Sequence, residues 1–141
     1  MLVRLLYVSR AVDPADQKAV DGILSAARAH NASLGITGIL CYGDGVYMQC
    51  IEGGRNAVNQ LYGHIVQDKR HHDVVLLRYE EITERSFSGW TMGMVNLNRV
   101  NMSIMLKYSE TPTFDPYSVS GEASQAMLQE LMATASIIGR A

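Results

Sequence analysis

The stretch that decides the fold covers residues 36–51 and reads ITGILCYGDGVYMQCI. Two apolar runs, residues 36–42 and 46–51, are rich in the β-branched and aromatic side chains that favour extended backbone. The residues between them, Gly43-Asp44-Gly45, tolerate the positive φ angles of a tight turn. We therefore expect a β-hairpin here.

Helical patterns lie on both sides of the hairpin. Upstream, Asp13 supplies a capping acid ahead of Pro14, a residue favoured at the first helical position. An apolar stripe then carries the first helix to about residue 29, with His30-Asn31 at its C-terminal end. The same spacing predicts a second helix over residues 56–68. The i, i+3, i+4, i+7 stripes consist of Val20, Ile23, Leu24 and Ala27, and of Val58, Leu61, Tyr62 and Ile65.

Three further strands complete the pattern. Residues 2–9 are apolar enough for a buried strand, and residues 74–79 and 90–95 flank a loop at residues 87–89. The order β-α-β-β-α-β-β predicts an α+β, ferredoxin-like fold with one added strand and both helices on one face of a largely antiparallel sheet. In this topology the first and third strands are neighbours.

The last third of the chain is expected to be helical. A short helix is predicted near residues 100–107, then a linker with Pro112 and Pro116, then a helix over residues 121–138. These helices are expected to cover the second face of the sheet, because a sheet of this size needs cover on both faces. An oligomer contact through them is compatible with that role. The apolar residues available for either are Met102, Ile104, Met105, Leu106, Met127, Leu131, Met132, Ile137 and Ile138.

Composition excludes several classes of protein. The 141 residues, 48% hydrophobic and 18% charged, suit one globular domain. The net charge of -2, without a basic run, argues against nucleic acid or an anionic membrane as a partner. No apolar stretch has membrane-spanning length and the N-terminus lacks a secretory pattern, so we expect a cytoplasmic protein with Cys41 and Cys50 reduced.

Motifs for metal binding or common catalysis are not found in the sequence. The four histidines, His30, His64, His71 and His72, lack the ligand spacing of a closed metal site. No P-loop, GxGxxG or Gly-x-Ser-x-Gly pattern occurs. We expect neither a metal site nor hydrolase or kinase activity.

Polar residues on apolar elements are more informative, because a buried polar group needs a partner. Tyr7 and Ser9 share one face of the first strand, and Gln49 lies in the middle of the third. Asn31 ends the first helix above the same sheet. These residues are either satisfied core polars, with Asn31 as a helix C-cap, or the rim of a slot for a planar ligand rich in heteroatoms.

Together these residues resemble the BLUF family of flavin photoreceptors over most of the first 95 residues. The resemblance implies a BLUF flavin-binding core over residues 1–97, and residues 98–141 resemble the C-terminal extension of short, single-domain members. Five motifs in the family's order carry it: Leu6-Tyr7-Val8-Ser9, His30-Asn31 with Gly35-Ile36-Thr37-Gly38-Ile39-Leu40, Gln49-Cys50-Ile51-Glu52-Gly53, Asp68-Lys69-Arg70-His71-His72, and Phe87-Ser88-Gly89-Trp90-Thr91-Met92.

This resemblance implies a non-covalently bound flavin between the two helices, FAD by preference, with FMN or riboflavin as alternatives. Asn31 and Gln49 are expected to bond the pyrimidine edge of the ring, with Tyr7 behind Gln49 and either Trp90 or Met92 beside it. The sequence departs from some members at His64, which replaces a basic arginine. The remaining cofactor-binding candidates are Ser9, Ile23, Arg28, His30, Ile65, Asp68, Arg70 and His71.

The implied function is that of a blue-light sensor and not of an enzyme. Electron and proton transfer from Tyr7 through Gln49 is expected to rearrange the hydrogen bonds to the flavin and to shift its absorption to the red. The signal is expected to pass to a partner protein in trans, and the chain to form a homo-oligomer. Two alternatives stay open: a small flavin-dependent oxidoreductase, for which no second substrate site is evident, and a colourless, ligand-free interaction module.

Overall fold

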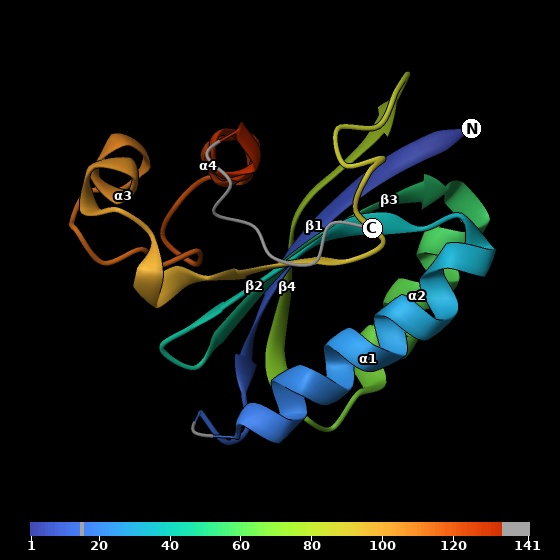
Figure 1. Ribbon diagram of the computed structural model, residues 1–141, viewed down its shortest axis with the longest axis horizontal. Helices are drawn as coiled ribbons and strands as arrows, with labels where there is room; N and C mark the ends of the chain where they lie inside the picture. The colour runs from blue at the N-terminus through green and yellow to red at the C-terminus, as the bar shows by residue number, and fades with distance from the viewer. Residues whose placement is uncertain (15, 134–141) are drawn as a thin grey trace.

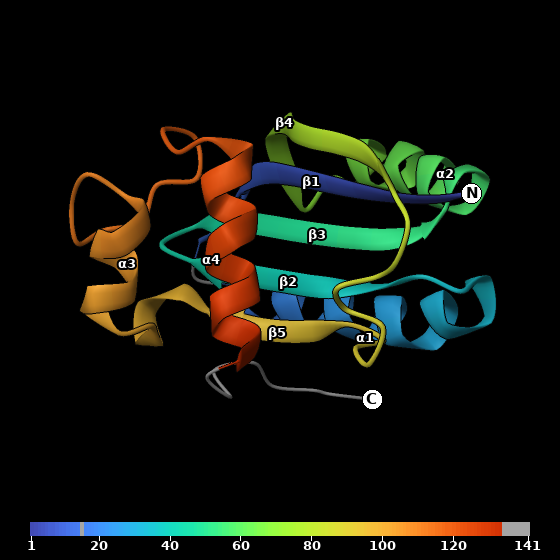
Figure 2. The ribbon, with the colours of Figure 1, turned by 90° about the horizontal axis from the view of Figure 1, so that it is seen from above.

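A five-stranded sheet between two helical layers forms the protein in the computed structural model, which describes residues 1–14 and 16–133 (Figure 1). The strand order is β4-β1-β3-β2-β5, with every neighbouring pair antiparallel except β2 and β5. Helices α1 and α2 cover one face, and α4 crosses the other (Figure 2). The ferredoxin-like α+β prediction is confirmed. The elements are β1 (Leu2–Ala11), α1 (Gln17–Leu34), β2 (Thr37–Gly43), β3 (Val46–Gly54), α2 (Arg55–Gln67), β4 (His71–Ile82), β5 (Gly93–Asn96), η1 (Leu97–Arg99), α3 (Met102–Tyr108) and α4 (Gly121–Ala133).

The predicted hairpin forms β2 and β3, with a turn one residue shorter than expected. Gly43 pairs with Val46, so that only Asp44 and Gly45 lie outside the ladder. Both have positive φ, 51° and 75°, as a two-residue turn that follows the twist of its strands requires. A Cβ at residue 45 would also approach the ring of Pro14 to 3.1 Å. The turn thus depends on glycine for conformation and for space.

Helix α1 differs from its prediction at both ends. Asp16 is the N-cap, accepting from the backbone N–H of Ala19 at 3.1 Å, so the prediction of Asp13 as cap and Pro14 as first helical residue is wrong. The helix runs on to Leu34, where Gly35 ends it in the left-handed conformation with φ 70°. Asn31 is therefore inside the helix and not its C-cap.

The strands near the C-terminal side also differ from prediction. β4 extends over twelve residues because it pairs along the whole of β1. β5 begins at Gly93, so Trp90 and Met92 lie in the irregular segment before it and not in a strand. The described part of α4 ends at Ala133. The predicted continuation to residue 138, with Ile137 and Ile138, lies outside the described residues.

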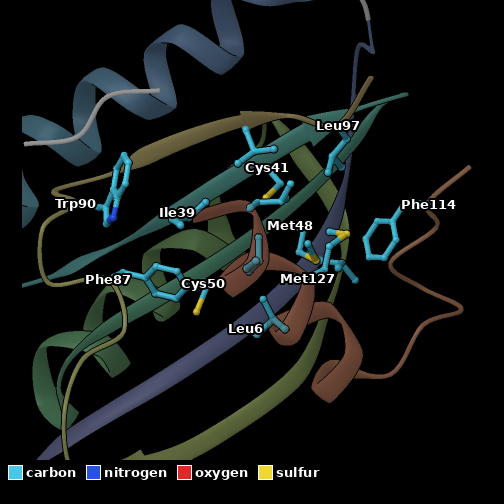
Figure 3. Packing of buried hydrophobic residues seen from close by; sticks show 14 of the residues in the cluster. Leu6, Ile39, Cys41, Met48, Cys50, Phe87, Trp90, Leu97, Phe114 and Met127 are labelled. Atoms are coloured by element: carbon cyan, nitrogen blue, oxygen red, sulfur yellow. The ribbon is translucent and has the colours of Figure 1, made fainter. Parts of the chain in front are cut away.

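Two hydrophobic cores lie on the two faces of the sheet. The first packs Val3, Leu5 and Ile51 against Val20 and Leu24 of α1. The second joins the opposite face to α4 and to the loops around it. Figure 3 shows members of the second core: Leu6, Ile39, Cys41, Met48, Cys50, Phe87, Trp90, Leu97, Phe114 and Met127.

The C-terminal helices therefore cover the second face, as predicted. Met105, Met127 and Leu131 are buried there, whereas Met102 and Leu106 of α3 remain 61% and 48% exposed. Cys41 and Cys50 are buried free thiols. Within residues 1–14 and 16–133, no helix is both long and apolar enough to cross a membrane, and no three potential metal ligands cluster.

Candidate functional site

A cavity of about 420 Å³ lies between α1, α2 and the sheet. Its wall is mostly apolar, and alanines on both helices leave room for it. Polar side chains enter from β1, β3 and the ends of the helices. The lining residues are Tyr7, Ile23, Ala26, Ala27, His30, Asn31, Leu34, Leu40, Tyr47, Gln49, Ala57, Gln60, Leu61, His64, Ile65, Asp68, Arg70 and His71.

Tyr7 and Gln49 meet at the floor of the cavity. They are directly opposite each other in the β1–β3 ladder, so both side chains project toward the helices. The Tyr7 hydroxyl donates a hydrogen bond to Gln49 Oε1, and both side chains are buried. Burial, with the nearby carboxylate of Asp68, raises the pKa of the Tyr7 phenol far above its usual range. Tyr7 is thus a neutral phenol whose proton is held at the glutamine.

Met92 contacts the other end of the Gln49 carboxamide. Gln49 Nε2 donates to Met92 Sδ at 3.4 Å, and sulfur is a weak acceptor. The Met92 side chain belongs to the core facing α1 and α2, whereas Trp90 packs in the opposite core with Phe87. Of the two candidates left open by the sequence, Met92 is the one beside Gln49 in this structure.

Asn31 presents an unsatisfied donor to the cavity. It is 2% exposed, lines the cavity from α1, and its Nδ2 has no hydrogen-bond partner among the described residues. A buried polar group without a partner costs about 1–3 kcal/mol. Since its backbone carbonyl already accepts from Ile36, only the side chain is left to bind something else. The orphaned amide indicates a ligand with a hydrogen-bond acceptor.

A second polar cluster lies where α2 passes into β4. Arg70 donates to Asp68 with its Nη2 at 2.6 Å, and this bond lowers the pKa of the Asp68 carboxyl. His71 Nε2 lies 2.5 Å from the Ile65 carbonyl, which can only accept, so Nε2 carries the proton. In the neutral ring, Nδ1 then accepts from the Ser9 hydroxyl at 2.7 Å. Ser9 thus orients His71 from behind the cavity wall.

Nine of the residues proposed from sequence therefore surround one cavity. Ser9 and Arg28 do not line it: Ser9 binds His71, and Arg28 Nε donates to the Met92 carbonyl at 3.2 Å. Trp90 lies on the opposite face of the sheet. The nine that line the cavity are Tyr7, Ile23, His30, Asn31, Gln49, Ile65, Asp68, Arg70 and His71.

Tyr47 is a cavity residue that the sequence-based site did not include. It is buried beside His71, with ring centroids 6.3 Å apart, and its hydroxyl has no partner among the described residues. It lies two residues before Gln49 in β3 and so projects from the same face of the sheet, which was the available signal. Gln60 and the alanines gave no comparable signal, because such residues on a helix face are usually surface or packing residues.

The geometry fits a flat ligand with polar edges. Ile23 from α1 and Ile65 from α2 supply apolar walls on either side. Asn31 and Gln49 supply amide donors and acceptors at the rim, and the phenol of Tyr7 is hydrogen-bonded to Gln49. A few placed polar groups in an apolar cleft are typical of cofactor sites.

Relatives match a little under two thirds of the chain. The photoactivated adenylate cyclase subunit beta of Euglena longa is 39% identical over 92 residues, which are 64% of this chain and 11% of that protein. The subunit alpha of Euglena gracilis is 42% identical over 86 residues, 61% of this chain and 8% of that protein. This chain thus spans about a tenth of the length of these relatives.

Solved structures match nearly the whole chain. The photo-activated state of BlsA has a TM-score of 0.85 and 32% identity, covering 94% of this chain and 95% of that one. The dark state of BlrB, a BLUF protein, has a TM-score of 0.77 and 33% identity, covering 95% and 96%. The model of the family described as sensors of blue-light using FAD matches residues 2–93. With most of its length matched and the neighbouring folds in agreement, this chain belongs to the BLUF family of flavin-binding blue-light sensors.

Proposed function

We propose that this chain binds FAD non-covalently in the cavity between α1 and α2 and acts as a reversible light switch. The observation that carries the proposal is the hydrogen-bonded series Tyr7–Gln49–Met92 at the cavity floor, beside the orphaned Asn31 amide. Gln49 Nε2 makes a weak hydrogen bond to Met92 Sδ, so it can exchange this partner for another. The cavity has space for a ligand that would supply the new partner.

The residues that hold the cofactor divide by chemistry. Asn31 Nδ2 would donate to a carbonyl of the ring, which would remove the cost of leaving this donor unpaired. Ile23 and Ile65, which line the cavity from α1 and α2, would provide apolar contacts to the ring. Asp68 and Arg70, with His30 and His71, are assigned to the ring edge and the hydroxylated or phosphorylated tail, where charge and hydrogen-bond donors are needed. His64, which stands where some members of the family carry an arginine, also lines the cavity.

The switching chemistry uses the phenol and the amide. A bound flavin supplies blue-light absorption and, when excited, a strong one-electron oxidant. Tyr7 would give an electron to that oxidant, and its hydroxyl proton would move to Gln49 Oε1, with which the hydroxyl already forms a hydrogen bond. After the electron and the proton had returned to Tyr7, the carboxamide of Gln49 would be left rotated or tautomerised. Its hydrogen bond to Met92 Sδ is weak, so little opposes that change.

The signal is proposed to reach a partner protein. The relatives named above are subunits of photoactivated adenylate cyclases, and the matched part of each is a small fraction of its length. We propose that this chain catalyses no reaction of its own, that residues 1–97 form the sensor, and that residues 98–141 carry the output. Exposed Met102 and Leu106 on α3 offer an apolar contact for a second copy. Free Cys41 and Cys50 are consistent with action in the reducing cytoplasm.

An absorption spectrum before and after blue illumination tests the proposal. The expected result is a flavin band that shifts to longer wavelength and relaxes in darkness. A band that bleaches without shifting would indicate a flavin oxidoreductase, and a colourless protein that takes up no added flavin would indicate an interaction module. Chromatography of the extracted cofactor distinguishes FAD from FMN and riboflavin.

A further inference from the structure

The segment between β4 and β5, residues 83–92, carries Met92 to its place beside Gln49. The segment has no helix or strand of its own, so its position depends on hydrogen bonds to the rest of the protein. Glu52 of β3 provides the hydrogen bonds in the first half of this segment. Glu52 Oε1 accepts from the Phe87 N–H at 2.7 Å, and Oε2 accepts from the Ser86 N–H at 3.0 Å.

Glu52 is an unusual residue for this task, because its carboxylate is 0% exposed. A buried carboxylate is costly unless it is paired and hydrogen-bonded. Arg4 of β1 provides the pairing, with its Nε at 2.8 Å and its Nη2 at 2.7 Å from Glu52 Oε2. Glu52 lies on the α4 face of the sheet and takes no part in the cavity. Cofactor binding therefore gives no reason for this charge.

Further bonds hold the same segment to its surroundings. The Gly38 N–H of β2 donates to the Trp90 carbonyl at 2.9 Å, and Arg28 of α1 donates to the Met92 carbonyl at 3.2 Å. No alanine could replace Gly38, since a Cβ there would come within 2.1 Å of the Cys50 carbonyl oxygen. Glu52 holds the first part of the segment, and these bonds hold its last part. The position of Met92 Sδ relative to Gln49 therefore depends on the position of the whole segment.

The same network reaches α4 by two routes. Arg4 Nη2 donates to Ser86 Oγ at 2.7 Å, and Gln129 Nε2 of α4 donates to the same oxygen at 3.4 Å. Arg4 Nη1 also binds Glu80 at 2.8 Å, and Glu80 Oε2 binds Arg78 at 3.0 Å. Arg78 Nη1 in turn donates to Gln125 of α4 at 3.1 Å. A displacement of residues 86–92 therefore alters bonds made by α4.

We propose that Glu52 is a positioning residue of the light switch: through Arg4 and the backbone of Ser86 and Phe87 it holds Met92 against Gln49 in darkness and transmits movement of that segment to α4. The proposal rests on the proposed function, since it names how the same site is coupled to the output helix. In the proposed switch the arrangement described here is the dark state, and the return to it re-forms the bonds that Glu52 makes. Weakening those bonds is therefore expected to slow the return.

The test compares Glu52→Gln with Glu81→Gln. The first change removes the buried charge and replaces one acceptor oxygen with an amide donor, which then faces either the Phe87 N–H or the donors of Arg4 and Ser86. The second removes an exposed carboxylate of β4 that pairs only with Arg55 among the described residues. Flavin affinity is expected to stay unchanged in both. Dark recovery is expected to slow at least fivefold in Glu52→Gln alone, and light-induced changes in amide hydrogen exchange over residues 121–133 are expected to vanish only there.

A second variant covers the case in which Glu52→Gln fails to fold. Gln125→Leu with Gln129→Leu cuts the links to α4 and leaves the buried ion pair in place. It is expected to keep the red shift and lose the light-induced exchange change in α4. If the unchanged protein shows no flavin shift, the proposed function has failed. If it shows the shift, and the variants recover and exchange like Glu81→Gln, the role of Glu52 is wrong while the proposed function stands.

Discussion

The two faces of the sheet are built in opposite ways. Under α4, Met127, Leu128 and Leu131 have no exposed surface, and the buried carboxylate of Glu52 accepts from Arg4 and from two backbone amides. Under α1 and α2 a cavity of about 420 Å³ remains, bordered by the orphaned amide of Asn31 and the orphaned hydroxyl of Tyr47. The closed face stabilises the fold and the open face is arranged for a ligand. One strand, β3, contributes Gln49 to the open face and Glu52 to the closed one.

The largest effect is expected on the open face, from the pair at the cavity floor. Gln49→Leu and Tyr7→Phe are each expected to abolish the normal red-shifted state while flavin stays bound, since one removes the amide that changes partners and the other the proton donor. Difference absorption spectroscopy measures the outcome. A full reversible shift in both variants would overturn the mechanism even in a yellow protein.

The next largest effect comes from comparing a leucine substitution under α4 with one at the wall of the cavity. Leu128→Ala is expected to lower the free energy of unfolding by about 3 kcal/mol, because it opens a void in a packed core. Leu61→Ala, at the wall of the existing cavity, is expected to cost only about 1–1.5 kcal/mol, mainly the transfer term. Urea denaturation of the flavin-free proteins measures both. Equal losses would contradict the difference between the faces.

Asn31→Ala is expected to separate binding from stability. Flavin affinity is expected to fall about tenfold, since a hydrogen bond worth about 1.4 kcal/mol is lost. The stability of the flavin-free protein is expected to stay the same or to rise, because among the described residues Nδ2 has no partner to lose and its unpaired burial is costly. Fluorescence titration gives the affinity. Asn59→Ala, on the exposed side of α2, is the matched control and should leave it unchanged.

Two neighbouring tyrosines offer a smaller contrast. Tyr42 and Tyr47 are paired across β2 and β3. The Tyr42 hydroxyl donates to the Pro14 carbonyl, whereas the Tyr47 hydroxyl has no partner in the described part of the chain. Tyr42→Phe is expected to destabilise the flavin-free protein by about 0.5–1 kcal/mol, and Tyr47→Phe to leave it unchanged or more stable. Thermal unfolding of the two variants measures both changes in stability. A greater loss from Tyr47→Phe would show that its hydroxyl is satisfied.

The smallest expected effect concerns pH at the cavity rim. The bond from Arg70 lowers the pKa of Asp68 in the folded protein, so the stabilisation is present above the unfolded-state pKa and is lost as the pH falls below about 4. Because both side chains are partly exposed, the loss is expected to be about 0.5 kcal/mol. Asp68→Asn should remove this part of the acid dependence. An unchanged acid limb in denaturation curves would contradict the assignment.

Local pattern was enough to predict the fold. The hairpin at residues 36–51 and the two apolar stripes predicted a ferredoxin-like sheet with β1 and β3 as neighbours, because few topologies join these elements. They did not predict that β5 pairs with β2. The ends of α1 were missed because Asp13 and Asp16 are both acceptable caps, and tertiary packing decided in favour of Asp16. The strand predicted at Trp90 was wrong because that segment is held by Glu52 and Gly38, contacts distant in sequence.

The central residues of the site were also predicted from a local pattern. Tyr7 and Gln49 stand out as polar residues on apolar strands, so alternation alone places them on one face. Whether Trp90 or Met92 lies beside Gln49 depends on the path of an irregular segment, which residue spacing does not specify. Tyr47 was passed over because a tyrosine on a strand is an ordinary core residue until its hydroxyl is found without a partner.

The buried pair of Arg4 and Glu52 also constrains how this protein can evolve. Replacing Arg4 alone leaves the carboxylate of Glu52 as an uncompensated buried charge, and replacing Glu52 alone leaves Arg4 with Glu80 as its one carboxylate partner among the described residues. A lysine cannot reproduce the two-nitrogen contact of Arg4. Each single substitution is therefore selected against, although an apolar pair of similar volume can be tolerated. Among descendants of this sequence, positions 4 and 52 are expected to change together, and neither to vary independently of the other.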